Sequence, residues 1–119
     1  MRAIECLAAA LAAGDDYTRP VNAFVDAFRR ASAADKERMV EEPIAVRGPL
    51  QGLVAGAVSA LCREAGIAAP EWVAHVRSDE PFFAFPARGF ALRVRLMIES
   101  PAPFRIRNVF VPQSFLLRA

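Results

Sequence analysis

The sequence contains very few of the residue types that usually carry enzymatic or metal chemistry. It has one histidine, His75, and two cysteines, Cys6 and Cys62, that lie far apart and outside any CxxC pattern. Protein zinc sites need three or four well-placed ligands, and acid–base catalysis most often uses a histidine near a partner group. The segment 48–52, Gly-Pro-Leu-Gln-Gly, lacks the lysine and the spacing of a phosphate-binding loop. We therefore expect no catalytic residues, no metal and no cofactor, and the sequence favours a non-catalytic protein.

Long apolar runs are also missing. The longest stretch without a charged residue, 48–62, spans 15 residues, whereas a membrane-spanning helix needs about 20 apolar residues. The apolar start of the chain, 1–14, contains Glu5 and has no marked basic region before it, so it does not resemble a signal peptide. The two cysteines are expected to be buried thiols in a reducing compartment. Together these absences predict a cytoplasmic protein without a membrane partner.

The chain that remains is an apolar, helix-prone one. It has 119 residues, of which 55% are hydrophobic and 24% charged, as expected for one ordered domain covering residues 1–119. Net charge is +2, but residues 1–79 carry 9 basic and 11 acidic side chains, and residues 80–119 carry 6 arginines and 2 glutamates. The C-terminal third is therefore basic, although too modestly to require nucleic acid as a partner.

Apolar spacing and terminal signals predict a series of short helices. The first covers 2–13 and ends at Gly14, and the second runs from Thr18 to about Ala31 with Pro20 in its first turn. Ser32 and Asp35 resemble a capping box for a third helix, 33–42, which we expect at the surface. The fourth, 50–65, is apolar all round and should be the central buried helix. A fifth short helix should begin at Pro70, and a last helical turn is expected within 112–117.

Two segments are candidates for an interface. Gly52, Gly56 and Ala60 are spaced four apart on the fourth helix, which allows another backbone to approach closely. The approaching element could belong to the same core or to a second copy of the chain. Phe82, Phe83 and Phe85 form an aromatic loop over 82–86, which either covers the core or, if exposed, marks a partner site.

The segment 88–111 combines large apolar side chains with arginines. Its alternation over 90–98 predicts a strand, with 104–111 as the second strand of a hairpin. The spacing of Leu92, Leu96 and Glu99 equally suits a helix that ends before Pro101. The polar side chains either form a solvated face whose arginine stems cover apolar surface, or bind an anion or an acidic partner. The residues of this candidate site are Arg93, Arg95, Glu99, Arg105, Arg107 and Asn108.

Two alternative functions follow from these residues. Residues 61–76 weakly resemble a helix-turn-helix unit, but its second helix would present Glu71, Trp72 and His75, which are poor base-reading side chains. A DNA-binding regulator is therefore an unfavoured alternative. An enzyme that uses Glu99 with Arg105 and Arg107 in a pocket is the other alternative.

A resemblance bears on the C-terminal half. It is carried by three features: Pro70-x-Trp72-Val73, the aromatic pair after Pro81, and the run 99–111, Glu-Ser-Pro-Ala-Pro-Phe-Arg-Ile-Arg-Asn-Val-Phe-Val. With these features the chain resembles small uncharacterised bacterial proteins over about residues 50–119. That group lies beside nucleotidyltransferase-like proteins in toxin–antitoxin-type pairs and has no established activity. Here Ile106 replaces a middle arginine, which puts any role of an arginine triplet in doubt. The group's Leu-rich segment is helical, and this resemblance favours a helix over 90–99.

The combined prediction is a single, mainly α domain of five or six short helices with an irregular C-terminal segment. The alternative fold is α+β with a hairpin at 90–98 and 104–111. The predicted function is a small cytoplasmic protein-interaction module, with a protein partner or a homodimer. The resemblance implies an accessory member of a toxin–antitoxin-like pair.

Overall fold

The computed structural model describes residues 3–12, 18–43, 49–83, 89–112 and 115–116. Within them the protein is mainly α-helical, as predicted. The helices are α1 (Ala3–Ala12), α2 (Thr18–Arg30), α3 (Ala33–Val40), α4 (Pro49–Ala65), α5 (Phe90–Glu99) and α6 (Ala102–Arg105), with a 3-10 helix, η1 (Glu71–His75). The strands β1 (Phe82–Phe83) and β2 (Val109–Phe110) form a two-stranded parallel sheet.

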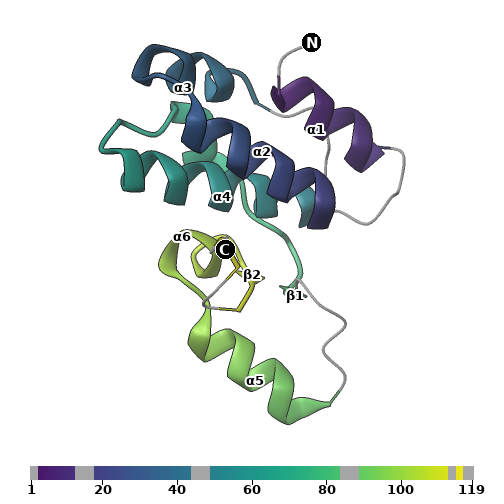
Figure 1. Ribbon diagram of the computed structural model, residues 1–119. Helices are drawn as coiled ribbons and strands as arrows, with labels where there is room; N and C mark the ends of the chain where they lie inside the picture. Colours follow the sequence, from purple (N-terminus) through teal and green to yellow (C-terminus); the bar gives the residue numbers. More distant parts are fainter. Residues whose placement is uncertain (1–2, 13–17, 44–48, 84–88, 113–114, 117–119) are drawn as a thin grey trace.

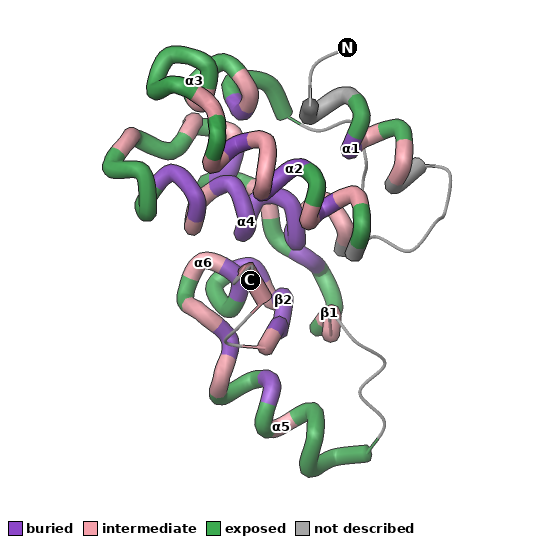
Figure 2. The backbone as a smooth tube through the Cα atoms, viewed as in Figure 1, coloured by how far each residue is buried: buried purple, intermediate pink, exposed green. Residues whose placement is uncertain are grey.

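Helix α4 lies at the centre of the fold. Its residues 52–58 are all buried, because α2 packs on one side of it and α6 and β2 pack on the other. Helices α1 and α3 pack against α2, so the N-terminal three helices form one layer and the C-terminal elements form a second (Figure 1). Buried segments accordingly concentrate on α2, α4 and the chain around β2, as Figure 2 shows. The prediction of a central fourth helix is confirmed.

The predicted helix ends are largely confirmed, since they depend on local chemistry. Ser32 accepts a hydrogen bond at 3.2 Å from the backbone N–H of Asp35 and caps α3. Gly66 has φ +73°, and the N–H groups of Gly66 and Ile67 donate to the carbonyls of Arg63 and Cys62. This is a Schellman ending, which favours glycine because of its left-handed conformation. Helix α3 is less superficial than predicted, because Val40 is buried.

Several C-terminal predictions need correction. The helix over 90–99 is confirmed, so the hairpin alternative is wrong; 90–98 is helical, and α6 begins at Ala102. The expected fifth α-helix is the short 3-10 helix η1, with Pro70 before its first residue. The first two residues of the expected aromatic loop form β1, and its third phenylalanine, Phe85, lies outside the described residues. Phe115 and Leu116 pack against the core, as expected for the last turn; 113, 114 and 117 are not described.

In the part of the chain that the structure describes, no helix is long and apolar enough to cross a membrane.

Candidate interaction surface

Residues 100–111, here called the C-terminal clasp, hold the second layer onto α4. Phe104 is fully buried against the notch at Gly56, where the Cβ atom of any larger residue would lie 2.6 Å from the Phe104 Cδ1 atom. Val109 fills the neighbouring notch at Gly52, and a Cβ atom there would lie 3.1 Å from the Val109 Cγ2 atom. Both glycines are buried under the chain's own C-terminal segment, so in this fold they are core contacts and offer no surface to a second copy.

The polar residues of the clasp are also used within the chain. The Arg107 guanidinium is buried, and it donates to the carbonyl of Val73 at 2.8 and 3.2 Å and to that of Pro103 at 2.6 Å. Burial lowers the pKa of Arg107 from its ordinary value, but carbonyl acceptors compensate the desolvated charge. Arg107 therefore joins η1 to α6 and is not available to an anion.

Ser100 and Asn108 complete these internal connections. The Ser100 hydroxyl donates to the carbonyl of Leu96 at 2.6 Å and accepts from the N–H of Val111 at 2.8 Å, so it ties the end of α5 to the chain after β2. Asn108 has φ +62°, a left-handed conformation that asparagine tolerates better than most residues. Its side-chain amide donates to the Ser78 carbonyl at 3.3 Å. The polar residues of the run 99–111 that make these contacts therefore have structural roles in this chain.

Helix α5 projects from the rest of the molecule (Figure 1). It rests on the body through Leu96, which is 5% exposed and packs with Phe110 and the half-buried Phe83 in a small cluster separate from the main core. The Arg93 guanidinium lies 5.4 Å from the centre of the Phe83 ring, in a cation–π contact. This attachment leaves most of the helix surface open to solvent.

The outer side of α5 carries an apolar stripe formed by Phe90, Val94, Met97 and Ile98. Their spacing, i, i+4, i+7 and i+8, is the one by which a helix normally faces a core. Val94 and Ile98 lie about 160° around the helix from Leu96, by the 100° turn per residue. Phe90 is 84% and Ile98 72% exposed, Met97 is exposed and Val94 is half-buried. The stripe therefore faces away from the body and toward solvent.

Charged side chains flank the stripe. The Arg95 Nε and Glu99 Oε2 atoms form an ion pair at 2.6 Å, one turn apart. Arg93 lies on the other side of the stripe, above Phe83. Arg105 belongs to α6 and is exposed. Of the predicted anion site, Arg93, Arg95 and Glu99 share one helix, whereas Arg107 and Asn108 are held inside the clasp, so the six residues do not form one site.

The same contacts weigh against the two alternative functions. Glu99 is paired with Arg95, and Arg107 donates to backbone carbonyls, so internal contacts already occupy two of the three side chains of the predicted pocket of Glu99, Arg105 and Arg107. In the unit 61–76, the second segment is the five-residue 3-10 helix η1, too short for a recognition helix in the major groove. His75 is exposed on η1.

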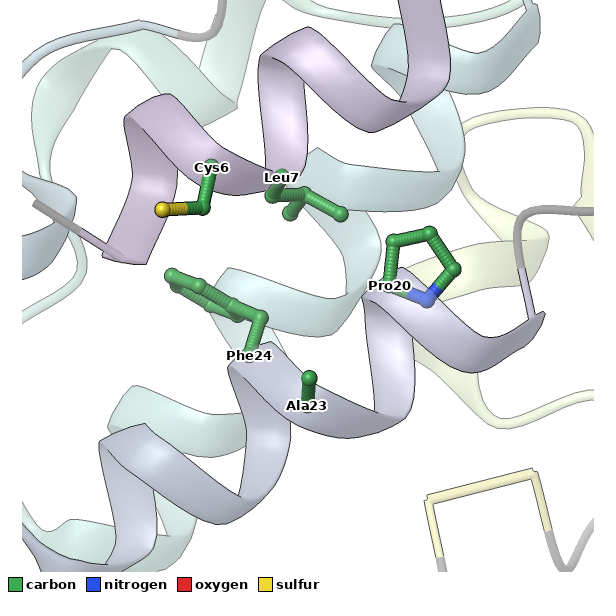
Figure 3. A pocket seen from close by; sticks show the side chains of 5 residues that line it. All are labelled: Cys6, Leu7, Pro20, Ala23 and Phe24. Carbon is green, nitrogen blue, oxygen red and sulfur yellow. The ribbon is translucent and has the colours of Figure 1, made fainter. Parts of the chain in front are cut away.

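A small apolar hollow of about 210 Å³ lies between α1 and α2 (Figure 3). It is lined by Cys6, Leu7, Pro20, Ala23 and Phe24. Apart from the Cys6 thiol these side chains have no polar group that could move a proton, so the hollow has no catalytic constellation. Cys62 is buried, as predicted, and burial raises its pKa, whereas Cys6 is exposed, contrary to the prediction. Among the described residues, no group of three His, Cys, Asp or Glu side chains could hold a metal ion.

The sequence prediction missed the apolar residues of the α5 stripe. The signal was present, since positions 90, 94, 97 and 98 have helical spacing. It was obscured because Leu92 and Leu96 form a second apolar row on the same helix, and the sequence does not say which row faces the body. Comparison of the chain with protein-family models, with curated proteins and with solved structures finds no match.

Proposed function

We propose that the protein is a non-catalytic protein-interaction module and that the stripe on α5 is its docking surface. The observation that carries the proposal is the exposure of Phe90 and Ile98, at 84% and 72%, in a row with core-type spacing. Burying two such side chains contributes about 3–5 kcal/mol. Because α5 does not bury these side chains in its own core, the free energy of burying them can stabilise a complex with a partner.

The polar side chains of the clasp support the same proposal, because they are already engaged within the chain. Arg107, Asn108 and Ser100 are occupied by internal hydrogen bonds, and the hollow between α1 and α2 has an apolar lining. Among the described residues, the α5 stripe is therefore the best candidate for a binding surface. Membership in a toxin–antitoxin-like pair stays a prediction from the resemblance; co-purification with the product of the neighbouring gene would test it.

Site-specific photo-crosslinking tests the docking surface. The full chain would carry p-benzoylphenylalanine at position 98 and be irradiated in the cells that naturally express it. We expect a protein adduct from position 98 and none from position 37, since Glu37 is an exposed residue on α3, in the other layer of the fold. Adducts from position 37 alone, or from neither position, would refute the proposal.

A substitution pair then tests the stripe with the identified and purified adduct protein. Ile98→Asp should weaken its binding about thirtyfold or more, the size of an interface hot spot. Ile106→Asp is the matched control, because Ile106 is an isoleucine of similar exposure, 65%, on the clasp rather than on the stripe. Equal effects of the two substitutions would mean that the stripe has no special role.

A further inference from the structure

Helix α5 is attached to the body by very few side chains. Of its ten residues, all of which the structure describes, only Leu96 is buried, and Figure 2 shows exposed positions along most of the helix. Leu96 packs with Phe110 and Phe83 in a cluster that is separate from the main core. Arg93 adds a cation–π contact with the same Phe83 ring. The docking of α5 therefore depends on one small group of side chains, whereas residues 52–58 of α4 are all buried.

An undocked α5 would not keep its helical structure. Isolated helices shorter than about 12–15 residues are marginal in water even with the best helix-forming sequences, and α5 has ten residues. Its N-cap residue, Gly89, has no side chain that could accept from the first N–H groups. Val94 and Ile98 are β-branched, which lowers helix propensity, and the exposed ion pair of Arg95 and Glu99 stabilises a helix only slightly. Undocking and unwinding of α5 are therefore one event.

Ser100 marks the point where the main body begins. It is buried, and its hydroxyl accepts from the N–H of Val111 at 2.8 Å. Pro101 follows with extended backbone, and α6 begins at Ala102. Because proline has no N–H group, the hydrogen-bond ladder of α5 cannot continue through it into α6. The loss of α5 therefore need not spread to α6, where Phe104 is part of the main core.

We propose that α5 is an independently opening arm, which undocks and unwinds as a unit up to Ser100 while α4, α6 and the two-stranded sheet stay folded. Opening exposes Leu96 and the face of Phe110 that it covers, and it leaves the main core intact. The inference concerns the chain alone. Its consequence, that opening of the arm decides whether the docking stripe exists as a helix, rests on the proposed function.

Native-state amide hydrogen exchange of the full chain, followed for each residue by NMR, tests the arm. The amides of residues 94–100 report on α5, since even the N–H of Ser100 donates to the Leu96 carbonyl, at 3.0 Å. The amide of Val111, which donates to the Ser100 hydroxyl, reports on the body. Exchange is measured over urea concentrations below the unfolding transition. A local opening exposes little surface and responds weakly to urea, whereas global unfolding responds strongly.

We expect residues 94–100 to share one opening free energy and to exchange at least about thirtyfold faster than the slowest amides of α4, with weak urea dependence. The amide of Val111 should exchange with the body. Equal rates and equal urea dependence in α5 and α4 would overturn the inference. A gradient of rates along α5 would also overturn it, because it indicates fraying from one end. Exchange of Val111 together with α5 would overturn the boundary at Ser100.

Two substitutions then separate the arm from the core. Val25→Ala removes two methyl groups from the main core. It should speed exchange in α4 about tenfold or more and leave α5 unchanged, because that core stays packed when the arm opens. Leu96→Ala should remove most of the protection of α5. Trp72, the one tryptophan of the chain, lies on η1 and packs against the main core, so its fluorescence should still show a cooperative urea transition in that variant. If Val25→Ala speeds both helices equally, or Leu96→Ala abolishes the Trp72 transition, arm and body form one unit and the inference is wrong.

The protein identified by cross-linking separates this inference from the proposed function. When it saturates the chain, exchange of residues 94–100 should slow, because a partner that binds only the helical form of α5 stabilises that form. No slowing would refute the stripe as a docking surface and leave the arm standing. Slowing in the complex, with equal rates for α5 and α4 in the free chain, would leave the docking surface standing and refute the arm.

Discussion

Substituting Gly56 tests whether the C-terminal clasp is part of the core. The Cβ atom of an alanine at 56 would lie 2.6 Å from the Phe104 Cδ1 atom and 3.0 Å from its Cε1 atom, far inside the 3.5–4.0 Å at which carbon atoms attract. The Phe104 ring is fully buried and packs edge-on against Phe115, at 5.6 Å between ring centres. The ring therefore has little room to retreat from the added methyl group.

The magnitude follows from two opposing effects. Gly→Ala inside a helix contributes about 1 kcal/mol, and overpacking a well-filled core costs about 1–3 kcal/mol. Because the contact at 56 is with a confined aromatic ring, we expect Gly56→Ala to lower the free energy of unfolding by about 1–2 kcal/mol. Gly52→Ala is the matched control. Its Cβ would have one tight contact, with a Val109 methyl at 3.1 Å, and ordinary contacts with the Ser78 N and Arg107 O atoms at 3.5 and 3.9 Å, so the helix gain should roughly offset the crowding.

Urea denaturation followed by circular dichroism measures both variants. The double variant Gly56→Ala, Phe104→Leu separates crowding from other effects, because the smaller side chain makes room for the methyl group. We expect a coupling energy of about 1–2 kcal/mol between the two positions. If Gly56→Ala is as stable as the parent, the packing of Phe104 into α4 is refuted. If its effect depends on protein concentration, Gly56 lies in a dimer interface instead.

Three further outcomes follow from the same structure. Arg107→Ala should lower the free energy of unfolding, measured by urea denaturation, by about 2–4 kcal/mol, because buried carbonyls lose a charged donor. Arg105→Ala, at an exposed position, should change it by less than about 0.5 kcal/mol. Equal losses would contradict the internal role of Arg107. Gly66→Ala should lower the melting temperature by several degrees, since left-handed backbone costs about 1 kcal/mol without glycine; an unchanged melting temperature would contradict the Schellman ending. Thiol labelling at neutral pH should modify Cys6 rapidly and Cys62 only on unfolding, because burial raises the Cys62 pKa and blocks access; rapid labelling of both would refute the burial of Cys62.

The predicted helices depend on local sequence signals, which contacts with distant residues do not override. Ser32, Gly66 and the apolar rows of α2 and α4 act within a turn or two of their own position, so the sequence is enough to place them. The two-residue strands are different. Each pairs with a segment more than 20 positions away in the chain, and neither has enough residues for an alternating pattern to be recognised.

The candidate site was predictable only in part. The sequence shows that apolar residues and arginines concentrate over 88–111, but the sequence prediction placed all the arginines of the candidate site in the same role. Arg107 differs from Arg105 because its guanidinium reaches the carbonyl of Val73 in η1 and is buried there, whereas Arg105 is exposed. The burial of a long side chain depends on which backbone carbonyls are within reach, and these belong to residues 103 and 73.

The sequence by itself determined a single helical domain, with close approach at Gly52 and Gly56, because periodicity, caps and missing side chains act locally. Only the tertiary structure decided that Phe104 and Val109 of the same chain fill those notches. It also decided which of the two apolar rows of α5 rests on Phe110. A helix with two such rows can bury either, and the row that packs on the body is selected by contacts with distant residues, which leaves Phe90 and Ile98 in solvent.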